Sequence, residues 1–132
     1  MAGSPKDRRY TREHEWVLLT DGEALVGITD FAQEQLGDLV YFDLPDPGKQ
    51  LRQNEKLGEV ESVKAVSEIY APVSGEIVEV NPKVNETPEV VNSDPYGEGW
   101  LLRLKPADPK ELEKLLPAEE YDALVATAGA EH

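Results

Sequence analysis

The stretch Gly58-Glu59-Val60-Glu61-Ser62-Val63-Lys64-Ala65-Val66-Ser67-Glu68 places one lysine midway between two short segments of alternating apolar and polar residues. Small and β-branched residues dominate both segments, so they predict two strands with Val63-Lys64-Ala65 at the tip of the hairpin between them. A lysine at such a tip extends a long flexible side chain into solvent, where a modifying enzyme can reach it. Hairpin tips also carry lysines for solubility alone, so the choice between these interpretations depends on the rest of the chain.

Further strands are predicted on both sides of this hairpin. Asp21-Gly22, between two apolar segments, is a strong signal for a short hairpin turn. The segments expected to form strands are residues 16–19, 24–28, 39–44, 75–80 and 100–104. The stretch that follows residue 80 is rich in Pro, Asn and Glu, and we expect it to be a loop as far as Asp94.

A short helix is predicted between the second and third of these strands. Asp30 is expected to be its N-cap, with Gln33 three residues later completing a capping box. Gly37 suits the residue that ends a helix. Phe31 and Leu36 would then face the core.

The C-terminal segment, about residues 108–128, has a helical pattern. Asp108-Pro109 is an N-cap followed by proline, and Pro117 is expected to end the first helix. A second helix is expected to stop near Gly129. The apolar positions of the two helices are Leu112, Leu115, Leu116, Tyr121, Leu124 and Val125. Several short strands with few helices predict a mainly β fold: one domain over residues 1–132, with a core at about 10–106, built as a flattened barrel or sandwich of two antiparallel sheets.

Composition excludes several classes of function. The chain has 13 basic and 27 acidic residues, a formal net charge of −14, so nucleic acid and anionic membranes are poor partners and a monomer is expected. Cysteine is absent, and the two histidines, His14 and His132, lie at opposite ends of the chain. We therefore expect no disulfide, no metal site and no histidine-based catalytic triad.

The sequence also indicates in which cellular compartment the protein is expected. No apolar run approaches the roughly 20 residues that a membrane helix needs. Residues 1–9 contain basic residues without an apolar stretch, so no signal peptide is expected. These features predict a bacterial-type cytoplasmic protein, or a mature form from which a presequence has been removed.

The hairpin and four other motifs resemble one known family. Glu61-Ser62-Val63-Lys64-Ala65, followed by Ala71-Pro72-Val73-Ser74-Gly75-Glu76, resembles the lipoylation region of the glycine cleavage H-protein family. His14-Glu15-Trp16, Gly27-Ile28-Thr29-Asp30-Phe31-Ala32 and Asn92-Ser93-Asp94-Pro95-Tyr96-Gly97-Glu98-Gly99-Trp100 are similar to further landmarks of that family, in the same order. The resemblance covers roughly residues 10–125.

The resemblance implies a lipoyl-type domain with lipoate joined to Lys64 through an amide. Such a domain has no turnover of its own. It carries an aminomethyl group from a pyridoxal-phosphate glycine decarboxylase (P protein) to a folate-dependent aminomethyltransferase (T protein). A dihydrolipoamide dehydrogenase (L protein) then reoxidises the lipoyl group, and a lipoylating enzyme attaches it in the first place.

The resemblance also implies a cleft into which the loaded arm folds. The aminomethyl group is a cation, so carboxylates are its expected partners. Glu15 is the first candidate and Glu68 the second, whereas we assign no role to Glu13. Glu59 and Glu61, beside the tip, are candidates for recognition by the lipoylating enzyme. For all of these acids the simpler interpretation is a solvated surface charge.

The remaining landmark residues have structural interpretations. His14 is expected to be a packed or capping residue. Trp16 and Trp100 are expected to be aromatics of the core or of the cleft wall.

Four alternatives were weighed against this interpretation. A biotin carrier resembles Met-Lys-Met at the modified site, whereas Lys64 lies between Val63 and Ala65. Lipoyl domains of 2-oxoacid dehydrogenases usually show Asp-Lys-Ala within a much longer chain. A relay protein that passes lipoate or octanoate to other lipoyl domains needs the same tip lysine, so it remains open. A Ser62–Lys64 catalytic dyad can be drawn, because both residues fall on one face of a strand.

Overall fold

The computed structural model describes residues 4–130, which leaves Met1 and His132 outside the described part. Its strands are β1 Arg9–Tyr10, β2 Glu15–Thr20, β3 Glu23–Ile28, β4 Leu39–Asp43, β5 Gln50–Leu51, β6 Lys56–Ser62, β7 Val66–Tyr70, β8 Gly75–Val80 and β9 Leu102–Pro106. Its helices are α1 Asp30–Leu36, α2 Pro82–Glu86, α3 Glu89–Ser93, the 3₁₀ helix η1 Pro109–Lys114 and α4 Ala118–Ala130.

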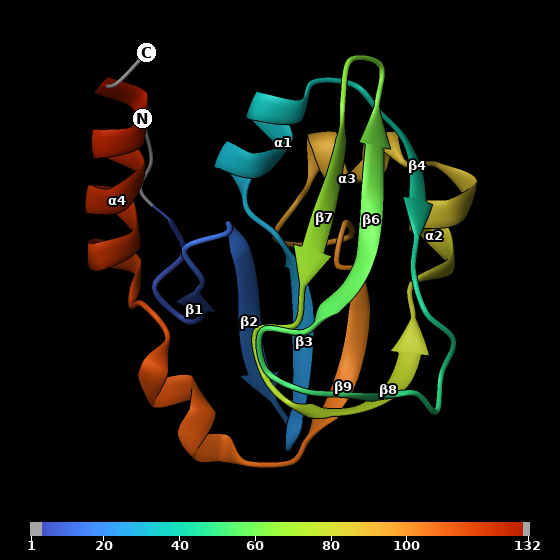
Figure 1. The fold of residues 1–132 in the computed structure, drawn as a ribbon, viewed down its shortest axis with the longest axis vertical. Coiled ribbons are helices and arrows are strands. Elements are labelled where there is room, and N and C mark those ends of the chain that lie inside the picture. The colour runs from blue at the N-terminus through green and yellow to red at the C-terminus, as the bar shows by residue number, and fades with distance from the viewer. Residues whose placement is uncertain (1–3, 131–132) are drawn as a thin grey trace.

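The strands form two antiparallel sheets (Figure 1). The larger has the order β1-β2-β3-β9-β8-β5, and the smaller has the order β4-β6-β7. The predicted fold class, mainly β with two antiparallel sheets, is confirmed. In Figure 1 the hairpin of β6 and β7 extends beyond the rest of the small sheet, with α1 beside its tip.

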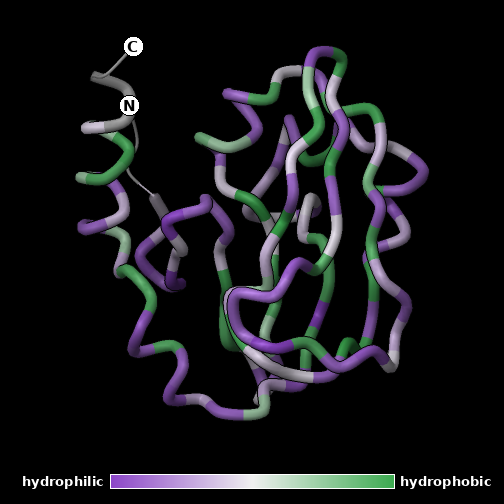
Figure 2. The backbone as a smooth tube through the Cα atoms, in the orientation of Figure 1, coloured by the Kyte–Doolittle hydropathy of each residue, from purple (hydrophilic) through white to green (hydrophobic). Residues whose placement is uncertain are grey.

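The main core lies between the two sheets. Val26, Leu102 and Leu104 of the large sheet belong to the same buried cluster as Val60 and Ile69 of the small sheet. The colouring in Figure 2 follows this arrangement, with hydrophobic and hydrophilic stretches interleaved along the strands. Alternation along each strand therefore places one set of side chains in the core and the other in solvent.

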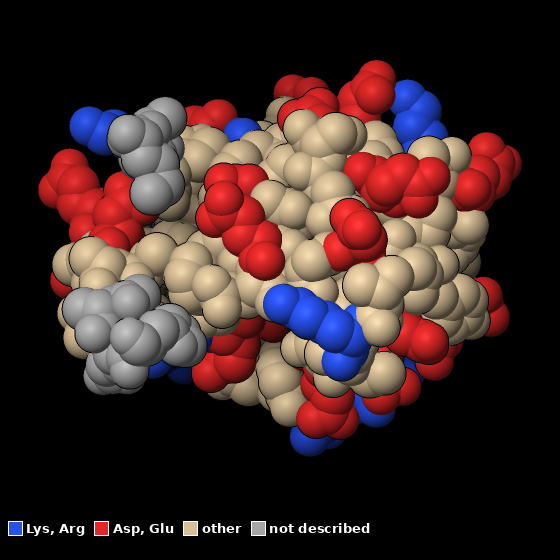
Figure 3. Space-filling view, turned by 90° about the horizontal axis from the view of Figure 1, so that it is seen from above, with Lys and Arg blue, Asp and Glu red and all other residues tan. Residues whose placement is uncertain are grey.

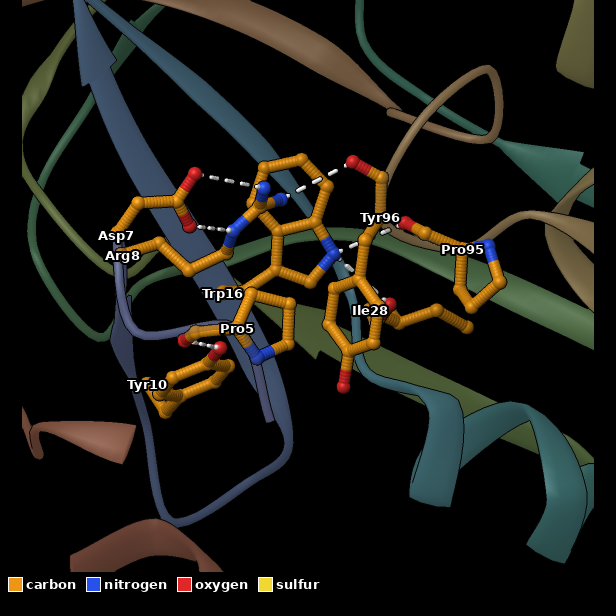
Figure 4. A network of polar contacts seen from close by, with 8 residues as sticks. All are labelled: Pro5, Asp7, Arg8, Tyr10, Trp16, Ile28, Pro95 and Tyr96. Atoms are coloured by element: carbon orange, nitrogen blue, oxygen red, sulfur yellow. Dashed lines mark hydrogen bonds and ion pairs between the residues drawn. The ribbon is translucent and has the colours of Figure 1, made fainter. Parts of the chain in front are cut away.

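A second cluster forms around Trp16 and Tyr121, where β1 and the N-terminal part of α4 meet β2. The indole Nε1 donates to the carbonyl oxygens of Ile28, at 3.0 Å, and Pro95, at 3.1 Å (Figure 4). The Arg8 guanidinium lies over the indole, 4.6 Å from the ring centroid. A Cβ at Gly27, the cross-strand partner of Trp16, would lie 2.5 Å from the indole, so this position needs glycine. Trp16 is therefore a core aromatic.

Helix α1 begins one residue earlier than the sequence indicated. Thr29 is the N-cap, and its hydroxyl accepts a hydrogen bond from the Ala32 N–H at 3.2 Å. The predicted N-cap, Asp30, is instead the first helical residue, and its carboxylate accepts from the Gln33 side chain at 2.7 Å. The prediction was wrong because either residue can cap, and Thr29 is held in place by donating its N–H to the His14 carbonyl.

Two other details of the predicted chain path needed correction. Phe31 packs against the His14 ring, 4.8 Å between centroids, and does not join the main core, whereas Leu36 does pack against it. The expected loop up to Asp94 contains the short helices α2 and α3. Asn81 caps α2 by accepting from the Lys83 N–H, with Pro82 in the first turn.

The C-terminal segment begins as predicted with Asp108 as N-cap, although its first helix is 3₁₀. The Glu111 carboxylate accepts two hydrogen bonds at 2.7 Å from Ser74, one from its backbone N–H and one from its hydroxyl. These bonds fix the segment to the end of the large sheet before α4 begins. Helix α4 continues to Ala130, one residue past the predicted stop. Among residues 4–130, no helix has both the length and the apolar character for crossing a membrane.

Candidate functional site

Lys64 lies exposed at the tip of the β6–β7 hairpin, as predicted. The tip is a tight turn closed by a 2.8 Å hydrogen bond from the Ser62 N–H to the Ala65 carbonyl. The Ser62 hydroxyl accepts from the N–H groups of Lys64, at 3.3 Å, and Ala65, at 3.1 Å. Ser62 thus satisfies the turn's backbone donors, a task that suits serine.

The connection from α1 to β4 supports the tip from the side. The Val63 N–H donates to the Asp38 carbonyl at 3.0 Å. Gly37, with φ +82°, makes the sharp turn that brings this connection alongside. A Cβ at this glycine would lie 3.6 Å from Cε of Lys64, so the lysine stem passes close to it. The backbone that carries Lys64 is therefore held by Ser62 from within the turn and by Asp38 from outside it.

This geometry argues against the Ser62–Lys64 dyad. The Ser62 hydroxyl is buried, and its partners are the backbone of the turn. Among the hydrogen bonds of residues 4–130, none joins it to the Lys64 ammonium. The hydroxyl therefore acts as a structural support and is not placed as a nucleophile.

A cleft of about 290 Å³ lies at the other end of β7, lined by Glu13, Asn54 and Tyr70. Glu15 is bonded to the backbone of the lining residue Tyr70, with only 1% of its surface exposed. Its Oε2 accepts from the Tyr70 N–H at 3.2 Å, and its Oε1 accepts from the Thr11 hydroxyl at 2.5 Å. The structure thus excludes the solvated-charge interpretation for Glu15.

The environment of Glu15 makes it a proton-binding group near neutral pH. Burial raises the pKa of its carboxyl to about 7, against the opposing effect of the hydrogen bonds from Thr11 and Tyr70. The negative charge of Glu13 raises the pKa a little further. A cation entering the cleft would favour the ionised form of this carboxyl.

Glu68, an exposed residue, contacts the hydroxyl of Tyr70. Its Oε1 accepts from the Tyr70 hydroxyl at 2.8 Å, and its Oε2 lies 3.4 Å from the Lys56 ammonium. The Tyr70 hydrogen bond, followed by Lys56, holds the pKa of Glu68 below its usual range. Tyr70 therefore joins the two predicted acids, Glu15 at its backbone and Glu68 at its hydroxyl.

Comparison with known proteins decides the family. The family model described as "Glycine cleavage H-protein" matches residues 8–128. The chain belongs to the glycine cleavage H-protein family. The chain is 54% identical to the glycine cleavage system H protein of Symbiobacterium thermophilum, over 93% of this chain and 96% of that protein. It is 56% identical to a glycine cleavage system H protein of Thermus thermophilus, over 92% and 94% of the two chains.

A solved structure shares the fold of this H-protein family member. The crystal structure of a glycine cleavage system H protein from Mycobacterium marinum superposes with a TM-score of 0.85. The two chains are 44% identical, and the match covers 91% of this chain and 97% of that one. The lipoyl-type fold implied by the resemblance is thereby confirmed.

The acids beside the tip of this H-protein family member lie in different settings. Glu59 shares Lys56 with Glu68, at 3.6 Å. Glu61 is exposed, and no ion pair among residues 4–130 includes it. Of the two predicted recognition residues, Glu61 thus presents the uncompensated charge.

His14 is a packed residue, as the sequence indicated. Its backbone has φ +74°, and its ring Nδ1 lies 2.8 Å from the Tyr121 hydroxyl, which also contacts the Thr29 hydroxyl at 2.6 Å. Burial lowers the pKa of His14. Within residues 4–130, no group of three or more His, Asp or Glu side chains is placed to hold a metal ion.

Sequence reasoning missed the residues that organise the cleft. Thr11 and Tyr70 hold Glu15, and Asn54, with φ +71°, forms part of the wall. Thr11 could have been found, because a threonine four residues before an acid can bond to its side chain. Tyr70 and Asn54 carry no comparable signal, since the bond from Tyr70 to Glu15 and the place of Asn54 in the cleft wall depend on the tertiary fold.

Proposed function

We propose that this chain is the lipoyl carrier protein of the glycine cleavage system, with lipoate attached to Lys64. One observation supports this most directly: hydrogen bonds hold the backbone of the hairpin tip on two sides, while the Lys64 side chain that it carries is exposed. Swinging-arm transfer needs this combination of a fixed attachment point and a mobile side chain. The names of the relatives in the family favour this role over a lipoate or octanoate relay.

The residues around Lys64 fit an amide-linked acyl group. Lys56 and Lys83 have carboxylate partners, whereas no ion pair among residues 4–130 engages Lys64. Acylation there removes one positive charge without breaking a contact. The attached lipoyl group would supply a reducible dithiolane to which the one-carbon unit is joined.

The cleft at Tyr70 is the proposed resting place of the loaded arm. Glu15 would provide a negative charge beneath it and Glu68 another at its solvent side. A shielded ammonium group would gain two charge-assisted contacts there, and water would be excluded from it on the protein side. Glu13, at the cleft wall, adds to the negative potential.

The proposed partners follow from this role. The arm would visit the glycine decarboxylase, the aminomethyltransferase and the dihydrolipoamide dehydrogenase in turn, and the chain itself would catalyse nothing. Glu59 and Glu61 would help a lipoylating enzyme with a basic face to recognise the tip. The relatives are bacterial, and we propose a cytoplasmic monomer.

Intact mass tests the attachment. The protein is weighed before and after incubation with lipoate, ATP and a lipoate ligase, alongside Lys64→Ala and the matched control Lys56→Ala. We expect the wild type and Lys56→Ala to gain one lipoyl group and Lys64→Ala to gain none. A folded wild-type protein that gains nothing would overturn the proposal.

A second step separates the shuttle from the relay. Lipoylated wild type and lipoylated Glu15→Ala are compared in glycine-dependent turnover and in transfer of the lipoyl group to another lipoyl domain. A relay never holds the aminomethyl cation, so Glu15→Ala should impair only glycine turnover. Lipoylated wild type that transfers the group but sustains no glycine turnover would favour the relay.

A further inference from the structure

Strand β4 contains an irregularity close to the Lys64 hairpin. Leu39 pairs with Ser62, yet Tyr41 pairs with Glu61, so Val40 is an extra residue on this strand. Val40 and Tyr41 are consequently both exposed, at 47% and 55%, although a regular strand would send successive side chains to opposite faces. Bulges of this kind re-aim side chains, and here the result is an aromatic ring directed into solvent.

Tyr41 is part of a wider apolar surface. It lies opposite Glu61, which in turn lies opposite Val66, so all three share the outer face of the small sheet. Of the six large hydrophobic side chains exposed in the described chain, four lie here. We name them the tip patch: Val40, Tyr41, Val63 and Val66, the last two exposed at 69% and 61%.

Acids border the tip patch on the same sheet face. Asp43, Glu59 and Glu68 lie opposite one another across the three strands, two residues further along from Tyr41. Glu59 and Glu68 share the ammonium of Lys56, and no ion pair among residues 4–130 includes Asp43 or Glu61. Seen from the end that carries the hairpin tip, the surface shows many acidic groups and few basic ones (Figure 3).

We propose that the tip patch and its acidic border form the docking surface for the glycine decarboxylase. The partner would present lysines and arginines around an apolar recess that receives the Tyr41 ring. The inference rests on the proposed function for the partner's identity. It adds the identity of the docking face and of its anchoring residue, Tyr41.

Three properties of this face support that partner chemistry. Glu61, opposite Tyr41, precedes Lys64 by three residues, a separation of at most about 10 Å, so an enzyme that takes up the arm covers the patch. An exposed tyrosine amid smaller apolar side chains is the usual make-up of a binding hot spot. The carboxylates of Asp43 and Glu61, outside every ion pair of the described residues, favour a basic rim and would accelerate encounter at low salt.

Direct binding tests the proposal without the attached group. Unlipoylated wild type, Tyr41→Ser and the control Val78→Ser are titrated against purified glycine decarboxylase, and the Kd is measured by calorimetry. Val78 is an exposed valine on β8 of the other sheet. We expect Tyr41→Ser to weaken binding about tenfold or more and Val78→Ser to change it less than twofold.

Charge is tested with Asp43→Asn and the control Glu119→Gln, an exposed acid on α4. The wild-type Kd should rise with ionic strength, and this dependence should weaken in Asp43→Asn but not in Glu119→Gln. Circular dichroism checks that each variant is folded. If Tyr41→Ser does not fold, Val66→Ser takes its place.

Three results would overturn the docking surface. One is equal Kd values for Tyr41→Ser and Val78→Ser, and another is no binding by the unlipoylated wild type. The third is a wild-type dimer on size-exclusion chromatography that Tyr41→Ser dissociates, which would assign the patch to a second copy. The proposed function is tested by a different measurement: it fails if fully lipoylated wild type does not sustain glycine turnover.

Discussion

The Glu15 carboxylate accepts a hydrogen bond from the Tyr70 N–H at 3.2 Å, which ties the first residue of β2 to the last residue of β7. The bond joins the two sheets beside the cleft that Tyr70 lines. The acid best suited to hold a cation is therefore a buried group, positioned by backbone and by the Thr11 hydroxyl. Because the carboxyl is buried, its ionised form attracts a bound cation more strongly than a solvated carboxylate would. The same burial makes ionisation of Glu15 cost more free energy when no cation is bound.

Glu15→Gln should stabilise the protein at alkaline pH. The pKa of the Glu15 carboxyl is about 7 in the folded protein against an ordinary value of 4.5, so the folded state binds the extra proton between these pH values. Wild-type stability therefore falls as pH rises from about 4.5 to 7, by about 3 kcal/mol in all. Glutamine keeps one acceptor for the Tyr70 N–H and one donor for Thr11, and it does not ionise.

Urea denaturation at pH 4, 6 and 8 checks this prediction. The free energy of unfolding of Glu15→Gln should exceed that of the wild type at pH 8, and the difference should disappear near pH 4. Glu13→Gln, an exposed neighbour, is the control and should show little difference at any pH. A less stable Glu15→Gln at pH 8 would contradict the account.

Ser62→Ala should loosen the hairpin tip. The change removes the acceptor for the Lys64 and Ala65 N–H groups, at a cost of about 1 kcal/mol because these two residues are exposed and water can replace the hydroxyl. We expect faster amide exchange at these two residues and slower lipoylation of an intact Lys64. Ser67→Ala, on β7, is the control, and equal exchange in both variants would rule out the support role.

Tyr121→Phe should weaken the attachment of α4. It removes a hydroxyl that contacts the His14 ring and the Thr29 hydroxyl, while the stacking of the ring on Tyr10 remains. Because Thr29 is fully buried, the expected loss is about 1–2 kcal/mol. Thermal denaturation measures it, and Tyr41→Phe, with its ring in solvent, should be neutral.

Glu111→Ala should release the start of the C-terminal segment. Both donors of Ser74 lose a charged acceptor, which costs about 1.5–3 kcal/mol. Amide exchange at Ser74 should accelerate well before the sheets unfold. Glu113→Ala, two residues away and exposed, is the comparison, and an unchanged rate in Glu111→Ala would show that other contacts hold the segment.

The local pattern of residue types was sufficient to predict many of the strands of this fold. The strands of the Lys64 hairpin follow from β-branched residues in alternation, and the exposed lysine follows from its place at the tip. Helices α2 and α3 have five residues each, too short for a periodic apolar stripe to be visible. They depend on the Asn81 cap and on Asn92, whose side chain donates to the Gly37 carbonyl at 3.0 Å.

Of the candidate site residues, the position of Lys64 could be predicted from the sequence, whereas the burial of Glu15 could not. Lys64 was identifiable because its role depends on exposure, which a tip provides by itself. The burial of Glu15 could not be predicted, because it results from the end of β7 passing over the start of β2. The bulge at Val40 was equally hidden, since alternation alone gives no indication of an extra residue.

The support of the hairpin tip by Asp38 and Ser62 has a mechanical consequence. With the turn clamped, every rotation that displaces the far end of an attached arm occurs beyond the Lys64 α-carbon. The attachment point behaves as a fixed pivot, and the arm's end samples a shell centred on it. An enzyme that binds the body of the protein therefore encounters the released end of the arm at an effective concentration set by the length and stiffness of the tether.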